Sequence, residues 1–330
     1  MKAWQIVSKH RLEPVEVNQQ RSDNEVKIKI TKSAFSSTDK AIIEGRGEVY
    51  PIIPVRAAIG LVSEATGAFR LGERVVIDPY VCDFGDARPD TEGLVPNVKI
   101  MGVDVPGLLR DFAIVPRDNV CSLPENVKDS DALFTEYIAL GLKTLSVLGV
   151  KKGDYLAVIG ANTLGNIIAQ LAVYYQAIPI LVDSSPTKLK LAEKYGIYYT
   201  INSEQCDVER RVLEITSGRR ADRTVYEGKS ILPPSYAVSL TKDCGRVAFV
   251  GYSRFLEKEL RLSNILKKQL TIVGVENGFG DIKSALNMLA TKAIQTDGLV
   301  DKEITFDEIP KLLTEISEWP LTFSKIIINS

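Results

Sequence analysis

The first part of the chain, residues 1–125, contains short β-like runs that turn-forming glycines separate from one another. Short strand-like runs divided by turns are typical of antiparallel sheets. The clearest runs cover residues 26–30, 74–77 and 112–115. We therefore predict a small antiparallel or barrel-like β domain for residues 1–125.

The pattern changes its period in residues 126–292. Wholly apolar runs at 155–159 and 178–182 alternate with helix-like stretches at 164–176 and 186–195. Uninterrupted apolar runs suit strands that are buried on both faces. Strand–helix–strand alternation predicts a doubly wound parallel sheet with right-handed crossovers. The last segment, 293–330, is too short to build a core alone, so we expect it to pack on the first domain.

Composition and charge exclude several classes of protein. A net charge of -1 gives no long-range attraction to nucleic acid or to an anionic membrane. The four cysteines stand far apart, so neither a disulfide framework nor a zinc ribbon is indicated, and a reducing compartment fits best. The N-terminal residues lack the apolar stretch of a secretion signal, and polar residues interrupt the apolar-rich region 165–182. We expect a cytoplasmic protein that takes a small-molecule substrate.

A glycine-bounded loop carries the strongest functional signal. A dinucleotide phosphate loop follows a buried strand and opens a helix, and the residues at this place in the chain are Gly160, Asn162, Thr163, Leu164 and Gly165. The first glycine permits a tight turn, the last permits close packing of helix on strand, and the helix N-terminus faces a pyrophosphate. The middle glycine of the usual pattern is replaced by Asn162, which we expect to displace the pyrophosphate slightly or to bond to it.

The acidic residue of the same fingerprint is Asp183, which ends the next predicted strand roughly 20 residues on. A carboxylate there accepts hydrogen bonds from the adenosine-ribose hydroxyls and repels a 2′-phosphate. The sequence therefore favours NAD over NADP. Lys188, at the start of the following helix, is expected to reach the same ribose. The alternative is a structural strand–helix turn with a surface aspartate.

The chain resembles a known family, the medium-chain dehydrogenases/reductases of the zinc-type alcohol dehydrogenase superfamily. The resemblance covers nearly the whole chain, and it rests on short segments that match the family's patterns: Gly72-Glu73-Arg74-Val75, Phe112-Ala113-Ile114-Val115, Leu123-Pro124, Gly245–Gly251 and Lys325-Ile326-Ile327-Ile328. It implies a GroES-like β-barrel domain formed by 1–125 and 293–330, a Rossmann NAD-binding domain formed by 126–292, and an active site between them. It also implies a homodimer or homotetramer.

The family's metal sites do not carry over by residue type. Ser36 stands where zinc-containing members have a ligand cysteine, and Arg56 stands where they have a ligand histidine. A hydroxyl is a poor zinc ligand, and a guanidinium is a fixed cation that opposes Zn²⁺. The segment of about 80–100, where some members hold a structural zinc with four cysteines, keeps only Cys82. We therefore expect no zinc at either site.

The resemblance also points to the residues of the active site, each with a plainer alternative. Thr38 falls at the family's proton-relay hydroxyl, or it is a helix-capping threonine. Arg56 binds an anionic group or stabilises an oxyanion, or it forms a salt bridge with Glu136 or Asp39. Glu136 matches a glutamate near the zinc of polyol dehydrogenases and is expected to line the pocket or to pair with Arg56 in place of a metal. Ser36 completes the set of catalytic candidates.

Further candidates follow from place in the chain alone. Gly251 and Gly274 end later parallel strands, where the nicotinamide end of a cofactor lies, although both also suit turns. Three tyrosines are candidate proton donors, with packing as the alternative for each: Tyr50, Tyr80 and Tyr137.

Three functions fit these observations. The first is a zinc-independent NAD(H)-dependent oxidoreductase that interconverts an alcohol and a carbonyl compound, and the Ser36–Asp39 and Glu136 segments favour it. The second is an NAD(P)H-dependent enoyl or quinone reductase, whose conjugated substrate needs less help from a metal. The third is a non-catalytic NAD-binding protein that kept the scaffold.

Overall fold

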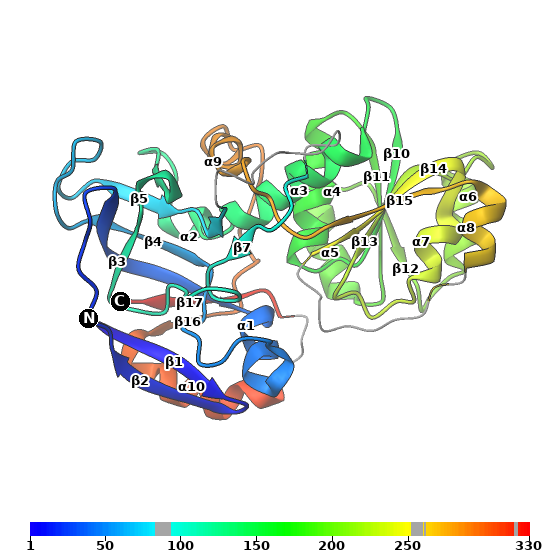
Figure 1. The fold of residues 1–330 in the computed structure, drawn as a ribbon. Helices are drawn as coiled ribbons and strands as arrows, with labels where there is room; N and C mark the ends of the chain where they lie inside the picture. The colour runs from blue at the N-terminus through cyan, green and yellow to red at the C-terminus, as the bar shows by residue number, and fades with distance from the viewer. Residues whose placement is uncertain (83–93, 252–259, 261, 320–322) are drawn as a thin grey trace.

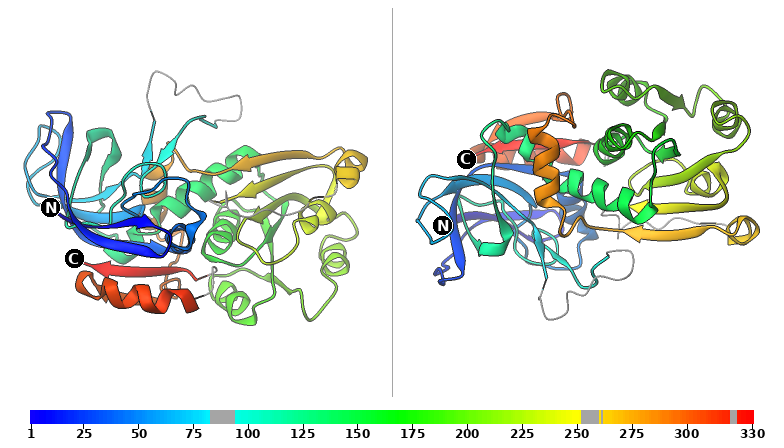
Figure 2. Two further views of the ribbon diagram at one scale, coloured as in Figure 1. Left: turned by 60° about the horizontal axis from the view of Figure 1, so that its bottom comes forward. Right: turned by 90° about the horizontal axis from the view of Figure 1, so that it is seen from above.

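The structure of the protein is a computed structural model that describes residues 1–82, 94–251, 260, 262–319 and 323–330. Two large sheets lie in separate halves of the molecule (Figure 1, Figure 2). Both chain termini lie in the half that holds the mostly antiparallel sheet, which we call the first half (Figure 1). The predicted combination of a β domain with a doubly wound parallel sheet is therefore confirmed.

The second half is built on six parallel strands in the order β12-β11-β10-β13-β14-β15. This order reverses direction at β10, and ligands bind in such sheets at the carboxyl ends of the strands beside the reversal. The strands are β10 (Tyr155–Ile159), β11 (Ile178–Asp183), β12 (Tyr199–Asn202), β13 (Ala221–Glu227), β14 (Thr241–Val250) and β15 (Thr271–Val275).

Helices cover both faces of this sheet, which explains why its strands are apolar without alternation. Leu156 and Val158 of β10 join the core on one face, whereas Ala157 and Ile159 join the core on the other. Among the described residues, one face is covered by α3 (Thr135–Leu148), α4 (Thr163–Tyr174) and α5 (Pro186–Lys194), and the other by α6 (Val208–Ile215), α7 (Ser235–Leu240) and α8 (Leu262–Lys268) (Figure 1).

The first half is built on a mostly antiparallel sheet in the order β16-β17-β3-β4-β5-β9, with β8 also paired to β3. The C-terminal strand β17 pairs with β3, so the last segment of the chain packs on the first half, as expected. The strands are β3 (Glu25–Ser36), β4 (Ala57–Val62), β5 (Arg74–Ile77), β8 (Phe112–Pro116), β9 (Val120–Ser122), β16 (Lys302–Thr305) and β17 (Lys325–Asn329).

Shorter elements complete the described chain. They are the hairpin β1 (Lys2–Ser8) and β2 (Arg11–Glu16), the pair β6 (Tyr80–Val81) and β7 (Lys99–Ile100), and the α-helices α1 (Ser37–Ala41), α2 (Asp129–Ala132), α9 (Ile282–Ala290) and α10 (Ile309–Glu315). A π-helical segment, η1 (Ile42–Arg46), and the short 3₁₀ helices η2 (Arg117–Asn119), η3 (Phe306–Glu308) and η4 (Ile316–Glu318) are added to these. None of the helices in the described part of the chain combines the length and apolar character that crossing a membrane requires.

One continuous apolar core joins the first sheet to the α3 and α4 face of the parallel sheet. Helix α3 lies at the centre of this core, and it packs on α4 and α9. The predicted domain boundaries near residues 125 and 292 fall between β9 and β10 and between β15 and β16. They stay predictions.

Candidate active site

The glycine-bounded loop joins the carboxyl end of β10 to the first turn of α4. Gly160 has a φ of +104°, which a residue with a side chain rarely adopts. A Cβ on Gly165 would lie 1.8 Å from the Gly160 carbonyl oxygen, so the helix approaches the strand as closely as glycine allows. Thr163 and Leu164 form the first turn of the helix behind this loop. The loop therefore has the shape that the sequence predicts.

Asp183 is the last residue of β11, and its side chain turns toward this loop. Its Oδ2 accepts a hydrogen bond from the Ala161 N–H at 2.7 Å, and its Oδ1 accepts one from the Ser185 N–H at 2.8 Å. The residue is buried. The carboxylate is therefore held rigidly beside the loop, which is where the ribose-binding acid of the fingerprint is expected.

The side chain of Asn162 links the loop to two charged residues. Its Nδ2 donates to Oε2 of Glu227 at 2.7 Å, and its Oδ1 accepts from the Lys188 ammonium. Glu227 ends β13, and burial raises its pKa, although Lys229 and Asn162 act in the opposite direction. The structure thus places Lys188 against Asn162, and a contact of Lys188 with a ribose stays a prediction.

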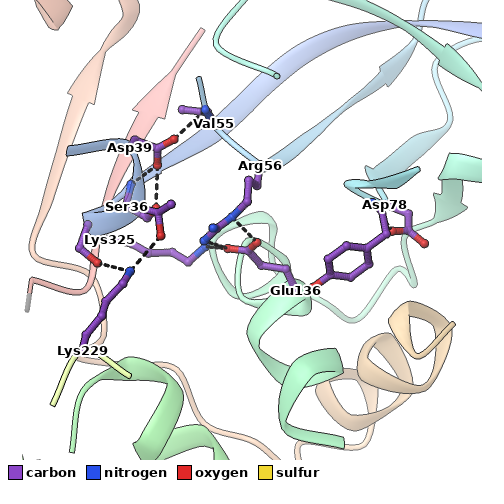
Figure 3. Close-up of polar contacts among 11 residues, drawn as sticks. Ser36, Asp39, Val55, Arg56, Asp78, Glu136, Lys229 and Lys325 are labelled. Atoms are coloured by element: carbon purple, nitrogen blue, oxygen red, sulfur yellow. Dashed lines mark hydrogen bonds and ion pairs between the residues drawn. The ribbon is translucent and has the colours of Figure 1, made fainter. Parts of the chain in front are cut away.

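Ion pairs occupy the region where the resemblance places a metal (Figure 3). Arg56 donates two hydrogen bonds to the Glu136 carboxylate, from Nε to Oε2 at 2.9 Å and from Nη2 to Oε1 at 3.3 Å. The ammonium of Lys325, the first residue of β17, lies 3.2 Å from Oε1 of the same carboxylate. Arg56 is 5% exposed, Glu136 6% and Lys325 0%. We call these three residues the buried ion triad.

The charges of this triad hold one another in place. Burial alone would raise the pKa of Glu136, but the cations of Arg56 and Lys325 lower it to about 2. Burial tends to lower the pKa of Arg56, but the Glu136 carboxylate raises it above its ordinary value. Burial lowers the pKa of Lys325, and Glu136 opposes that effect. At neutral pH Glu136 is therefore anionic and Arg56 cationic.

The triad bears on the alternatives for Arg56 and Glu136, and a role of Arg56 on an anionic group of the substrate stays a prediction. The salt bridge between them is confirmed, and both side chains also line the cavity between the two sheets. Lys325 was missed, although a lysine at the start of an otherwise apolar buried strand is a signal that the sequence contains. Its ammonium also lies over the rings of Tyr137 and Phe134, at 4.6 and 5.4 Å from their centroids.

Ser36 and Asp39 build the start of helix α1, where their polar groups bond to each other and to the backbone, and a catalytic role of Ser36 stays a prediction. The Ser36 N–H and hydroxyl both donate to Oδ2 of Asp39, at 2.8 and 2.7 Å. Oδ1 of Asp39 accepts from the Val55 N–H at 2.8 Å, which fixes the turn that leads into Arg56. Ser36 thus precedes the helix as its capping residue, and Thr38 lies inside the helix.

A second residue that sequence reasoning missed is Lys229, which follows the carboxyl end of β13. Its ammonium crosses the gap between the two halves and donates to Ser37 Oγ at 2.7 Å and to Thr38 Oγ1 at 2.9 Å. Charged residues just beyond the end of a parallel strand are a recognisable signal, because ligands bind at that edge. Lys229 therefore joins Thr38 among the candidate active-site residues.

A cavity connects these groups, and its lining includes Thr38, Arg56, Glu136, Asn162, Lys229 and Gly251. Tyr80 and Tyr137 also line it, whereas the Tyr50 hydroxyl bonds to the Ile42 carbonyl. Gly274 is exposed in the edge strand β15, so its proposed contact with a nicotinamide stays a prediction.

Within the residues that the structure describes, no group of three or more histidine, cysteine, aspartate or glutamate side chains is arranged to hold a metal ion. Residues 83–93 of the segment expected to lack a structural zinc site lie outside the described residues.

Comparison with known proteins identifies the family. Residues 22–125 match the alcohol dehydrogenase GroES-like domain, and residues 163–291 match the zinc-binding dehydrogenase domain. An uncharacterized zinc-type alcohol dehydrogenase-like protein of Haemophilus influenzae is 30% identical over 316 residues, covering 93% of this chain and 92% of its own. A sorbitol dehydrogenase of Halalkalibacterium halodurans is 26% identical over 304 residues, covering 87% of each chain.

Solved structures show the same fold over the whole chain. An alcohol dehydrogenase, RspB, of Escherichia coli CFT073 in complex with NADH superposes with a TM-score of 0.87 at 22% identity, covering 100% of this chain and 99% of its own. A protein of Sinorhizobium meliloti 1021, described as a zinc-binding dehydrogenase and bound to NADP, reaches 0.85 at 22% identity with the same coverage. With a GroES-like domain and a Rossmann-like parallel sheet, the chain belongs to the zinc-type alcohol dehydrogenase superfamily of oxidoreductases.

Proposed function

We propose that the protein is a zinc-independent, NAD(H)-dependent oxidoreductase of the alcohol or polyol dehydrogenase type. The observation that carries this proposal is the buried ion triad beside a loop shaped for a dinucleotide. The guanidinium of Arg56 is a fixed cation with no lone pair for a metal, and it already neutralises Glu136. The sorbitol dehydrogenase among the relatives supports a polyol or alcohol as substrate.

The residues of the cleft fit a dinucleotide. Thr163 has a buried hydroxyl oxygen with no hydrogen-bond partner among the described residues, and it lies in the first turn of α4, where a pyrophosphate would accept its hydrogen. The left-handed Gly160 and the tight Gly165 leave the backbone open to such a group. Asp183 would hold the adenosine ribose, and the cavity beyond Gly251 would receive the nicotinamide end.

A bound nicotinamide donates or accepts a hydride. The chain's own residues must then hold the substrate and balance charge on its oxygen. The Thr38 hydroxyl and the Arg56 guanidinium both line the cavity and are suited to this role, since each presents a hydrogen-bond donor to an oxygen on which negative charge develops.

A substrate panel tests this function. Polyols, alcohols and aldehydes should be turned over with NAD or NADH, and enones and quinones should not. Turnover of enones or quinones alone would establish the reductase alternative. NADH binding without turnover of any compound would establish the non-catalytic alternative.

We predict that the purified protein contains no stoichiometric zinc. The donor set at Ser36, Arg56 and Glu136 holds a buried cation already, so a divalent ion there would meet uncompensated repulsion. Elemental analysis should give far less than one zinc per chain, and a chelator should change neither the activity nor the thermal midpoint. One tightly held zinc per chain would contradict this.

We predict that NADH binds about tenfold or more tightly than NADPH, because Asp183 repels a 2′-phosphate. In Asp183→Asn this preference should shrink. Cofactor fluorescence titration measures both. Asp222→Asn is the matched control, since Asp222 also accepts a backbone N–H but lies at the opposite end of the sheet. Tighter binding of NADPH by the wild type would overturn the NAD assignment.

Two further expectations stay predictions. A homodimer or homotetramer would be tested by sedimentation of the purified protein. A cytoplasmic location would be tested by cell fractionation.

A further inference from the structure

The hydrogen bonds of the Lys229 ammonium lead into the cavity between the two halves, which points to more than a structural role. Lys229 belongs to the parallel-sheet half, yet its ammonium donates to two hydroxyls of α1 in the other half, those of Ser37 and Thr38. It lines the same cavity as Arg56 and Glu136. Its backbone N–H donates to Glu227 at 3.1 Å, which fixes the start of the side chain. The ammonium is thus aimed at the Thr38 hydroxyl from a rigid base.

The geometry leaves Thr38 able to pass a proton onward. A hydroxyl has one hydrogen to donate and two lone pairs to accept with. Because its Oγ1 accepts from Lys229, the Thr38 hydrogen is available for an oxygen in the cavity that Thr38 lines. Lys229 is only partly buried, so its ammonium can exchange protons with water.

Charged residues from several elements surround the Lys229 ammonium and set its pKa. Burial and the Arg56 cation lower its pKa, and the carboxylates of Glu227, Asp39 and Glu136 raise it, with a net value of about 8. Burial raises the pKa values of Tyr80 and Tyr137 above the ordinary value of a tyrosine, so neither hydroxyl ionises near neutral pH. Arg56 cannot release a proton in the working pH range.

We propose that Lys229 is the acid–base group of this enzyme and acts through Thr38, whose contact with the substrate oxygen the family resemblance already implies. This inference rests on the proposed function and names the group that supplies its proton. Lys229 is a positioning and proton-supplying residue, and Thr38 is the catalytic residue that touches substrate.

The proton balance is simple. In the reducing direction the carbonyl carbon gains a hydride from the reduced cofactor, and its oxygen gains the Thr38 proton. Thr38 recovers a proton from the Lys229 ammonium, which becomes a neutral amine and is reprotonated from water. In the oxidising direction the same protons move in reverse. Reduction therefore needs the ammonium and slows as the pH rises through about 8, whereas oxidation needs the amine and becomes faster over the same range.

The test compares Lys229→Arg and Lys229→Met with the wild type. Arginine keeps the charge and the hydrogen bonds but does not release a proton. Both variants should bind NADH and should lose about 10²–10⁴-fold in kcat, together with the limb of the pH profile near 8. Lys242→Met is the matched control, since Lys242 pairs with Asp222 at the far end of the sheet, and its kcat should not change.

A second readout does not depend on turnover. The pKa of Lys229 is measured by NMR of ¹⁵N-labelled lysine side chains, with the signal assigned by its absence from Lys229→Arg. Titration near pH 8 supports the proposal, and titration above 10 overturns it.

The outcomes separate this inference from the function on which it rests. Turnover by the wild type with kcat and pH profile restored in Lys229→Arg would show a purely structural cation, and only the acid–base role of Lys229 would be wrong. Turnover of no alcohol or carbonyl compound by the wild type would overturn the proposed function and this inference with it.

Discussion

Glu136→Gln is expected to destabilise the protein by about 3–5 kcal/mol, because it leaves two buried cations without their counter-charge. Arg56 and Lys325 would then face a neutral amide while being almost completely buried themselves. Denaturant unfolding of the wild type and the variant measures the difference. A loss of less than about 1 kcal/mol would show that the triad is not held as the structure has it.

Two control variants make this result specific. Glu214→Gln removes a glutamate that pairs with two arginines on the exposed face of α6, and it should cost far less stability than Glu136→Gln, because water and salt screen an exposed pair. The triple replacement Arg56→Met, Glu136→Leu and Lys325→Met removes all three charges together. It should recover most of the loss, since a buried ion group is costly chiefly when it is left incomplete.

The same triad predicts a pH dependence. The Glu136 pKa is about 2 in the folded protein and near 4.5 ordinarily. Because the folded-state value is the lower one, the stabilisation is fully present above pH 4.5 and is lost as the pH falls from 4.5 toward 2. Glu136→Gln should lack this component.

Gly165→Ala is expected to destabilise the protein by about 3 kcal/mol or more and to abolish measurable NADH binding. The added Cβ would lie 1.8 Å from the Gly160 carbonyl oxygen, and neither atom can swing aside, because the Cβ is fixed directly to the α4 backbone and the oxygen is itself a backbone atom. The helix must then move away from the strand, which opens the loop proposed for the pyrophosphate. Denaturant unfolding and cofactor fluorescence measure the two effects.

Gly67→Ala is the control for this prediction, because nothing lies within 4 Å of a Cβ at that position. It should change stability by no more than about 0.5 kcal/mol and leave NADH binding intact. Equal behaviour of the two alanine variants would mean that the close approach of α4 to β10 does not matter for the site.

The sequence by itself determined the features that depend on local pattern. The apolar runs at 155–159 and 178–182 are strands β10 and β11 because strands buried on both faces must be apolar throughout. The loop at Gly160–Gly165 and its acid Asp183 were found because turn, helix start and strand end have fixed spacings. The pairing of Arg56 with Glu136 was among the alternatives that the residue types left open.

Tertiary structure alone decided how the charges of the site are grouped. Lys325 meets Glu136 across 189 residues, and Lys229 meets Thr38 across 191. Such contacts leave no periodic trace in the sequence, since they depend on how the C-terminal strand and the end of β13 are folded against α3 and α1. Burial then changes the pKa values of these groups. The pKa of a group removed from water depends on its nearest neighbours, and only the fold selects those neighbours.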